Sequence, residues 1–313
     1  MEFYHQSVLL HESVEALAIR PDGVYVDGTA GGGGHSAAIA AKLDSGRLIA
    51  LDADPDAVRA ASERLAPFAA KARVVQANFR DMRRVLADLN VDAVDGILLD
   101  LGVSSHQFDT PARGFSYRSD APLDMRMSQT GPGAKELLET ASYAELVRIL
   151  REYGEERFAP RIANAICKQR EKKPLETTFE LSELVKEAYP APARRSGHPA
   201  RKTFQALRMA VNGELESLSV LLDDALSLLS PGGRLCVITF HSLEDRMVKQ
   251  RFLSWAQGCI CPPDFPVCIC GRKPQAQIIY KRGVLPSEKE LEANSRSRSA
   301  RLRVAEKCRV QED

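Results

Sequence analysis

The first hundred residues alternate between short apolar segments and helical patterns, and this alternation constrains the fold more than any other feature of the chain. The apolar segments lie at positions 24–26, 47–51, 73–76 and 96–99. The helical patterns between them lie at 35–43, 55–65 and 81–89. Near-continuous apolar strands separated by helices predict a parallel sheet that is covered on both faces.

Beyond position 100 this alternation stops, and the pattern becomes mainly helical before strands return. We expect a loop at 106–133, a helical region at 134–189, a basic proline-rich turn at 190–202 and a further helix at 204–229. We then expect a turn at 230–233 and strands at 234–240, 278–280 and 302–305. The simplest architecture is an α/β domain formed by 1–105 and 213–313, with a mainly helical domain inserted at 106–212.

Composition excludes several classes of protein. The chain has 313 residues, of which 44% are hydrophobic, and a formal net charge of +1. No run approaches the roughly 18 apolar residues needed to span a bilayer, and the first residues lack the basic start of a secretory signal. We therefore expect a cytoplasmic protein with no membrane partner. Residues 144–212 and 251–313 each carry a net charge of +5, which favours a polyanionic partner but also suits ordinary solvated helices.

A glycine-rich turn lies between the first strand and the first helix. It runs from Asp27 to His35 and includes four consecutive glycines. Its spacing does not match G-x-G-x-x-G, and Asp27 would face a diphosphate, so a dinucleotide is disfavoured. S-adenosylmethionine, which carries an amine, a ribose and no phosphate, suits these residues better. The alternative is a tight turn with no ligand.

Aspartates end three of the predicted strands, at positions 27, 52 and 100. Ligands of such sheets bind at the carboxyl ends of the strands. Asp52 stands at about the right distance along the chain to accept hydrogen bonds from ribose hydroxyls. Each aspartate taken alone is also compatible with a solvated loop.

Taken together, the motifs resemble the bacterial small-subunit rRNA (cytosine-N4)-methyltransferases, the RsmH or MraW family. The resemblance extends from His5 to about Glu306. Its motifs are His5-Gln-Ser-Val-Leu-Leu10, Asp27-Gly-Thr, Gly33-Gly-His35, Leu98-Leu-Asp-Leu-Gly-Val-Ser-Ser105, Gly114-Phe-Ser, Pro122-Leu-Asp-Met-Arg-Met127, Tyr153-Gly-Glu-Glu156, Thr203-Phe-Gln-Ala-Leu-Arg208 and Phe240-His-Ser-Leu-Glu-Asp-Arg246. Each motif is modest, but their order and combination are specific.

The resemblance implies a class I S-adenosylmethionine-dependent methyltransferase fold with an inserted helical domain. It implies methyl transfer to the exocyclic N4 of a cytosine in 16S rRNA, near the decoding site. It also implies a cofactor site in which Asp52 binds the ribose, Phe79 lies against the adenine, and Asp100 and Gln107 complete the pocket. The glycine turn would contribute Gly33, Gly34 and His35.

Two residues are candidates for the catalytic role. Many amino-methyltransferases have a D/N/S-P-P-Y/F motif after the fourth strand, where this chain has Asp100-Leu-Gly-Val-Ser104-Ser105. By position, Asp100 is the best candidate for an acceptor of the amine N–H, with cofactor binding as its competing role. His241 is a second candidate, although a structural hydrogen bond is the interpretation we favour for it.

An RNA substrate would need an apolar or aromatic surface for the target base and cations for the phosphates. Phe115, Tyr117 and Phe240 could supply the surface, and core packing explains them equally well. We expect two basic segments, 190–202 and 294–303, to contact the phosphates of the RNA. The first contains Arg194, Arg195, Arg201 and Lys202.

Two C-x-C pairs stand close together near the C-terminal end. They are formed by Cys259, Cys261, Cys268 and Cys270. Four thiolates can close a tetrahedral structural zinc site, although C-x-C is tighter than the common C-x₂₋₄-C. A redox-labile loop and an ordinary surface turn are the alternatives.

Other functions remain open at this point. The same fold can methylate a small molecule or a protein, and the basic helical insertion disfavours a small substrate only weakly. An RNA-binding assembly protein with an inactive pocket is a third possibility, and a dinucleotide-dependent dehydrogenase is the fourth.

Overall fold

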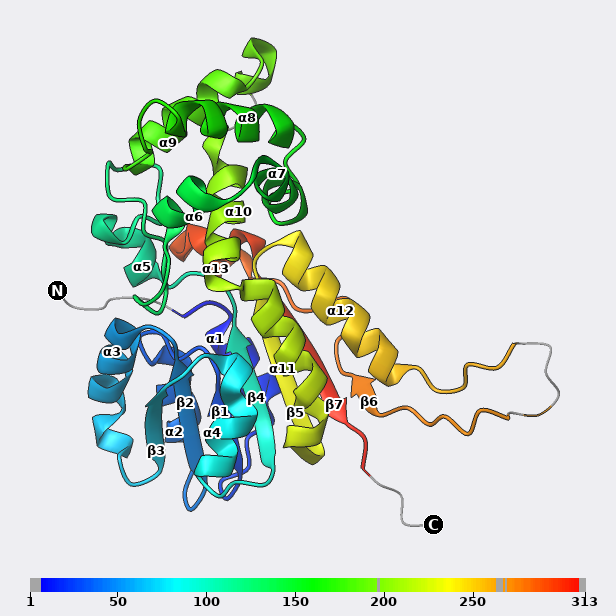
Figure 1. Cartoon of the computed structure of the whole chain (residues 1–313). Coiled ribbons are helices and arrows are strands. Elements are labelled where there is room, and N and C mark those ends of the chain that lie inside the picture. The colour runs from blue at the N-terminus through cyan, green and yellow to red at the C-terminus, as the bar shows by residue number, and fades with distance from the viewer. Residues whose placement is uncertain (1–6, 196–197, 263–266, 268, 310–313) are drawn as a thin grey trace. The chain divides into compact units, whose positions relative to one another are not determined.

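The computed structural model describes residues 7–195, 198–262, 267 and 269–309. The chain divides into two compact units (Figure 1). The first consists of Met1–Gly102 and Glu216–Asp313, and the second of Val103–Leu215. We call them the sheet unit and the helical unit.

The sheet unit is built on seven strands in the order β3-β2-β1-β4-β5-β7-β6. Strands β1 to β5 run parallel, and β7 lies antiparallel between β5 and β6. The strands are β1 (Val24–Asp27), β2 (Arg47–Asp52), β3 (Ala72–Gln76), β4 (Val94–Asp100), β5 (Leu229–Thr239), β6 (Ala276–Ile278) and β7 (Arg301–Lys307). The predicted parallel sheet is confirmed for the first five strands. The reversed β7 was not predicted.

Helices cover both faces of this sheet (Figure 1). Alternate residues of one strand join different cores: Ile49 and Leu51 pack in one, and Leu48 and Ala50 in the other. This follows from the two-residue period of a strand, and it explains why the strand is apolar throughout. The helices are α1 (Leu10–Ala16), α2 (Gly34–Ala41), α3 (Pro55–Leu65), α4 (Met82–Asp88), α11 (Glu214–Leu228), α12 (Ser242–Ala256) and α13 (Glu288–Ala293).

The helical unit has its own core, which is formed by one face of each of its longer helices. Serine and threonine N-caps define where two of them begin: the side chain of Ser142 accepts from Glu145 N, and Thr177 forms a capping box with Glu180. The helices are α5 (Ser105–Asp109), α6 (Ala134–Thr140), α7 (Tyr143–Glu152), α8 (Ala159–Arg170), α9 (Thr178–Ala188) and α10 (Ala200–Asn212).

Three expectations drawn from the sequence are wrong in detail. The single helix expected at 204–229 is two helices, α10 and α11, because Gly213 adopts φ +57° and ends the first. The turn expected at 230–233 lies within β5, where the register against β4 shifts and Gly232 has φ +82°. The loop expected at 106–133 contains most of α5 and a short 3₁₀ turn, Pro111–Arg113.

No helix within the described residues has both the length and the apolar character needed to cross a bilayer.

Inside the helical unit, the hydroxyl of Tyr189 donates a hydrogen bond to the Oε2 atom of Glu156, which is buried. The other oxygen, Oε1, accepts from Phe158 N at 2.8 Å. Substituting Tyr189→Phe removes one donor from a buried carboxylate, so we expect the free energy of unfolding of this unit to fall by about 1–3 kcal/mol.

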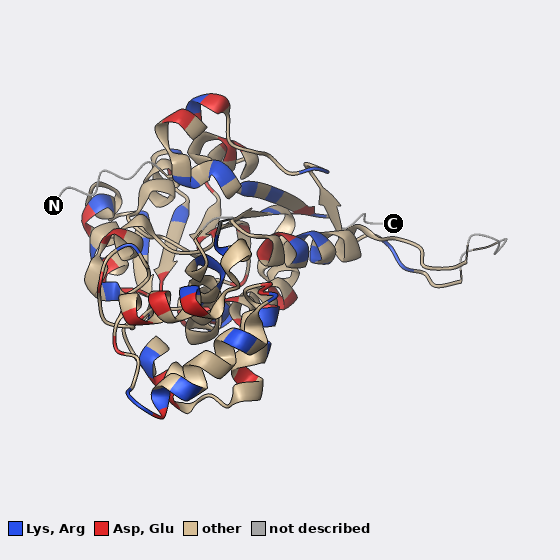
Figure 2. Cartoon of the chain, turned by 90° about the horizontal axis from the view of Figure 1, so that it is seen from above, with Lys and Arg blue, Asp and Glu red and all other residues tan. Residues whose placement is uncertain are grey.

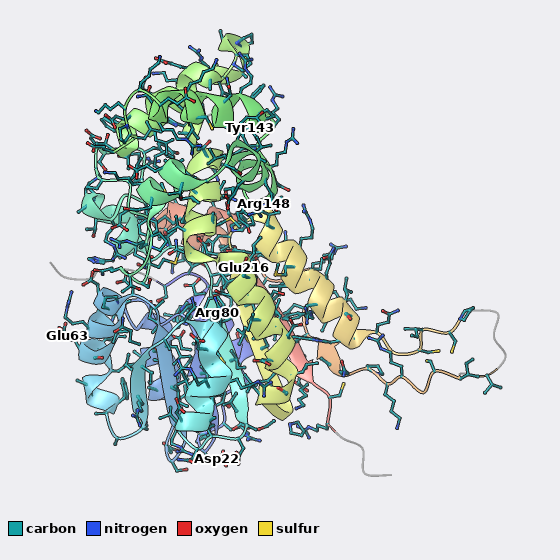
Figure 3. The ribbon with its side chains drawn as sticks, viewed as in Figure 1. Asp22, Glu63, Arg80, Tyr143, Arg148 and Glu216 are labelled. Carbon is teal, nitrogen blue, oxygen red and sulfur yellow. The ribbon has the colours of Figure 1, made fainter. Side chains whose placement is uncertain are left out.

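Hydrogen exchange of the α8 and α9 amides measures this change. Tyr143→Phe is the matched control, because Tyr143 is 47% exposed on α7 (Figure 3). Equal protection in the two variants would contradict the prediction.

Candidate active site

The glycine turn is held by a buried carboxylate. Asp27 ends β1 and is only 1% exposed. Its Oδ1 atom accepts from Thr29 N at 3.1 Å, and its Oδ2 atom accepts from the hydroxyl of Ser36 at 2.6 Å. Asp27 therefore ties the beginning of the turn to helix α2. It does not lie open to the amine of a ligand, contrary to the interpretation that the sequence favoured.

The turn constrains Gly33 through its backbone conformation and Gly34 through a close side-chain neighbour. Gly33 is the N-cap of α2 and has φ +76°, which an L side chain rarely adopts. A Cβ on Gly34 would stand 2.0 Å from the hydroxyl of Ser7. Gly33 has no side chain with which to cap α2, and the N–H of Ser36 in the first turn of the helix bonds to the carboxylate of Asp27.

Asp52 stands at the end of β2, beside the turn. Its Oδ2 atom accepts from Gly31 N at 2.8 Å, and its Oδ1 atom accepts from Asp54 N at 2.9 Å. Each carboxylate oxygen has a second lone pair, which can accept from a hydroxyl group. Burial raises the pKa of Asp52 to about 6. The predicted ribose-binding residue thus lies on the rim of the sheet beside the glycine turn.

Asp100 ends the neighbouring strand β4. Its backbone N–H donates to the hydroxyl of Thr29 at 2.6 Å, which links it to the glycine turn. Its Oδ1 atom is shielded from solvent and has no hydrogen-bond partner within the described part of the chain. Burial, followed by repulsion from the carboxylates of Asp27, Glu244 and Glu290, raises the pKa of Asp100 well above its usual value.

His35 connects Asp100 to the N-terminal segment. Its ring is buried, with Nε2 3.1 Å from the carbonyl oxygen of Val8 and Nδ1 3.8 Å from Asp100 Oδ2. Since a carbonyl can only accept, Nε2 carries a proton. The side chain predicted to contact a cofactor is therefore buried inside the sheet unit, between Val8 and Asp100.

Two further predicted cofactor residues differ in their placement. Phe79 begins the 3₁₀ turn Phe79–Asp81 and is partly buried against the core on the α4 face of the sheet. Gln107 belongs to the helical unit, where it is buried and forms a capping box with Ser104 at the start of α5. Its predicted role in the pocket stays a prediction.

The aromatic candidates for a base platform are mostly packed within the protein. Phe115 is buried in the core of the helical unit. Tyr117 stacks on His198 with ring centroids 4.2 Å apart, and Phe240 is partly buried in the sheet unit. His241 is the N-cap of α12 and forms a capping box with Glu244, which matches the structural role that we favoured.

The basic segments are only partly as expected. Basic side chains occur in both units (Figure 2). Arg201 and Lys202 are exposed on the first turn of α10 rather than on a turn before it, and Arg194 is exposed on the 3₁₀ turn Ala191–Arg195. Arg303 was expected to contact phosphate, which is wrong: it lies in β7, is 6% exposed and forms two hydrogen bonds with Asp245 at 2.6 and 2.8 Å.

Sequence reasoning missed three contributors to this rim. Thr29 positions Asp100, and Glu244 and Glu290 add to its negative surroundings. The two glutamates follow Asp100 by more than a hundred residues, so only the folded sheet unit brings them near it. Thr29 had a local signal, because it lies within the glycine turn itself.

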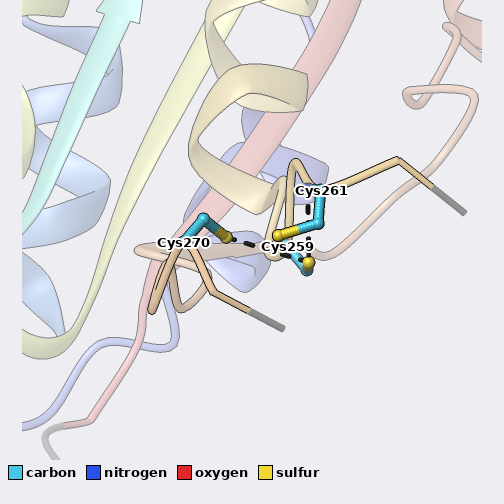
Figure 4. A group of neighbouring side chains, drawn as sticks. All are labelled: Cys259, Cys261 and Cys270. Carbon is cyan, nitrogen blue, oxygen red and sulfur yellow. Dashed lines mark hydrogen bonds between the residues drawn. The ribbon is translucent and has the colours of Figure 1, made fainter. Parts of the chain in front are cut away.

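The predicted zinc ligands Cys259, Cys261 and Cys270 lie on the segment between α12 and β6 of the sheet unit, with their side chains turned toward one another (Figure 4). Cys268 lies outside the described residues.

The whole chain is similar to known proteins. A family model described as the MraW methylase family matches residues 2–308. A ribosomal RNA small subunit methyltransferase H 2 from Agathobacter rectalis is 55% identical, over 98% of this chain and 99% of that protein. Ribosomal RNA small subunit methyltransferase H from Heliobacterium modesticaldum is also 55% identical, over 99% and 100%. The protein of that name from Symbiobacterium thermophilum is 54% identical, over 100% and 99%.

The buried carboxylate of Asp27 makes the stability of the sheet unit depend on pH. Burial raises its pKa from 3.8 to about 6. The folded state therefore binds a proton that the unfolded state has lost, so this contribution is complete below pH 4 and is lost as the pH rises through 6. The shift corresponds to about 3 kcal/mol. Asp27→Asn should therefore flatten the decline in the free energy of unfolding between pH 4 and 6.

Denaturation followed by Trp255 fluorescence measures the effect, because this tryptophan is the single one in the chain and is buried in the sheet unit. The control is Glu63→Gln, at an exposed position of α3 (Figure 3). The same pH profile in wild type and Asp27→Asn would contradict the argument.

Proposed function

Because this chain belongs to the MraW methylase family, we propose that it transfers a methyl group from S-adenosylmethionine to the exocyclic N4 of a cytosine in 16S rRNA, near the decoding site. The observation that carries the proposal is the rim formed by Asp52 and Asp100 beside the glycine turn, in a chain that matches this family almost from end to end. The sheet has the class I methyltransferase fold.

The residues of the rim fit this cofactor. Asp52 retains acceptor capacity for two ribose hydroxyls, and Gly33 and Gly34 have no side chains that would keep a ligand away from the backbone at the start of α2. Phe79 provides an apolar side chain for the adenine. The Oδ1 atom of Asp100 is an orphaned buried acceptor, which is the kind of group that a bound ligand satisfies.

The same rim fits a pyrophosphate poorly. Burial raises the pKa values of three carboxyl groups of the sheet unit, those of Asp27, Asp52 and Asp100, and repulsion from Asp27 contributes to the shift of the other two. A diphosphate would add two more negative charges to this environment at a high electrostatic cost. A cation would relieve the repulsion. This electrostatic argument disfavours the dehydrogenase alternative.

S-adenosylmethionine supplies an electrophilic methyl group bonded to a positively charged sulfur. A new bond forms between N4 and the methyl carbon, the bond from that carbon to sulfur breaks, and N4 loses one proton. The lone pair of N4 is delocalised into the cytosine ring, so the amine is a weak nucleophile. An acceptor on its N–H favours the developing pyramidal nitrogen, and we assign this task to the carboxylate of Asp100.

The identity of the RNA is the finer part of the proposal. The similar proteins are named for the small ribosomal subunit, which supports 16S rRNA or the assembled subunit as the partner. The exposed Arg201 and Lys202 of the helical unit support phosphate contacts. A ribosomal substrate also supports a cytoplasmic location.

Transfer of labelled methyl groups to unmethylated small subunits, followed by nucleoside analysis, tests the substrate. The expected product is N4-methylated cytidine in 16S rRNA. Label on a protein, on a small molecule or on a ring carbon would overturn the assignment. RNA binding without any transfer would favour the assembly-protein alternative instead.

Substituting Asp100→Asn should lower kcat by about 100-fold or more, with a smaller change in the KM for S-adenosylmethionine, because an amide accepts a proton poorly. The wild-type rate should fall as the pH drops through the raised pKa of Asp100, and the variant should lack this dependence. Single-turnover methylation across a pH series measures both effects.

The matched control is Asp95→Asn, on the same strand but near its opposite end, where Asp95 accepts from Arg20 and from Val24 N. An Asp100→Asn enzyme that keeps the wild-type rate would assign Asp100 to another role. A loss of cofactor affinity alone would place it in the cofactor site.

Reversing two adjacent charges, with Arg201→Glu and Lys202→Glu, should weaken RNA binding. It should also reduce the slope of log K against log salt by about 0.7–0.9 for each phosphate that these side chains neutralise in the wild type. Lys172→Glu with Lys173→Glu is the control, since these exposed lysines are also adjacent and lie in the same unit. A salt series that is the same for wild type and the Arg201/Lys202 variant would remove this segment from the interface.

A further inference from the structure

The segment between α12 and β6 extends from the sheet unit, and its described residues from Gln257 to Gln275 join none of the hydrophobic cores (Figure 1). Its base is closed by two contacts: Gln275 N donates to the carbonyl of Trp255 at 2.8 Å, and the guanidinium of Arg272 donates to the carbonyl of Ser254 at 2.9 Å. Farther out, Ile260 and Ile269 are 55% and 75% exposed. Apolar burial therefore does not hold the outer part of the segment in place.

Three thiols nevertheless converge there. The Sγ atoms of Cys259, Cys261 and Cys270 all lie within 4.8 Å of one another (Figure 4). The Sγ atoms of Cys259 and Cys270 are 3.8 Å apart, well beyond the ~2.05 Å of a disulfide. Two thiolates on one tetrahedral zinc ion, each about 2.3 Å from the metal, stand about 3.8 Å apart. The observed separation, over which the thiol of Cys270 donates to Cys259, equals that of two ligands of the same ion, so both sulfurs can bind one zinc without a large movement.

A backbone contact supports the same interpretation. The N–H of Cys261 donates to the Sγ atom of Cys259 at 3.4 Å. Hydrogen bonds to ligand atoms orient them and offset the negative charge of a thiolate. The cations Arg272 and Lys273 follow Cys270 in the chain, which also suits a site with an excess of thiolate charge.

We propose that Cys259, Cys261 and Cys270 bind a zinc ion that fixes the segment between α12 and β6. Each thiol loses its proton when it binds, so three protons leave and the three-thiolate site carries one net negative charge. Thiolate ligands select zinc over magnesium or calcium, which take oxygen. The site closes a loop and is separate from the rim of Asp52 and Asp100, so its role is structural.

A tetrahedral ion has a fourth position. By sequence, Cys268 stands two residues before Cys270, as Cys259 stands two residues before Cys261, and Cys268 lies outside the described residues. Cobalt substitution distinguishes the ligand sets, because the intensity of sulfur-to-cobalt charge transfer rises with the number of thiolates. Three thiolates are expected from the described residues alone, and a fourth is shown if Cys268→Ser lowers this intensity by about a quarter.

The full chain, purified with reductant and without chelator, is analysed for metals by mass spectrometry. We expect about one zinc ion per chain, falling to below about a tenth of that in the Cys259→Ser, Cys261→Ser double variant. Cys167→Ser, a partly exposed thiol of the helical unit, should keep its zinc. Removing the metal from the wild type should also speed tryptic cleavage after Arg272, which is half-buried, whereas Lys273 precedes Pro274 and is not cut. This measurement covers the case in which the double variant does not fold.

Zinc-free wild-type protein with reduced thiols would overturn the proposal, as would a disulfide among these cysteines or undiminished zinc in the double variant. Calorimetry with S-adenosylmethionine on the metal-free chain separates this result from the proposed function. Binding should be unchanged, so the zinc site can fail while the methyltransferase assignment stands, and the reverse also holds.

Discussion

The buried carboxylate of Asp27 is the contact on which the rim of the sheet depends. Its two oxygens bind Thr29 N and the hydroxyl of Ser36, which fixes the glycine turn against α2. Thr29 in turn receives the N–H of Asp100 from β4. One buried charge thus sets the spacing between the ends of two strands, and its desolvation is an energetic cost of holding them there.

That cost serves the chemistry of the site. Carboxyl groups brought together without cations have raised pKa values, and a cationic ligand lowers the energy of the assembly when it binds. The unpartnered oxygen of Asp100 has the same character, since it is an acceptor that the described part of the chain leaves unsatisfied. A cofactor with a positive charge and donor groups, as proposed above, would suit this rim.

Much of the fold could be predicted because strands 24–26, 47–51 and 96–99 are apolar on both faces and end in aspartate. The antiparallel direction of β7 could not be predicted, because a short apolar run does not indicate which way the strand runs in the sheet. The burial of Arg303 could not be predicted either, because its partner Asp245 is distant in sequence. At the site, Asp52 and Asp100 lie at the ends of β2 and β4, as the predicted strands indicated. The supporting roles of His35 and Asp27 depend on burial, which their local sequence does not show.

The strand order has a consequence for how the chain assembles as it is synthesised. The helical unit, Val103–Leu215, is one continuous stretch, whereas the sheet unit draws on residues from both sides of it. Strand β6 pairs with β7, and β7 consists of Arg301–Lys307. A nascent chain therefore contains every residue of the helical unit before it has β5, and β6 must wait unpaired until the following strand leaves the ribosome.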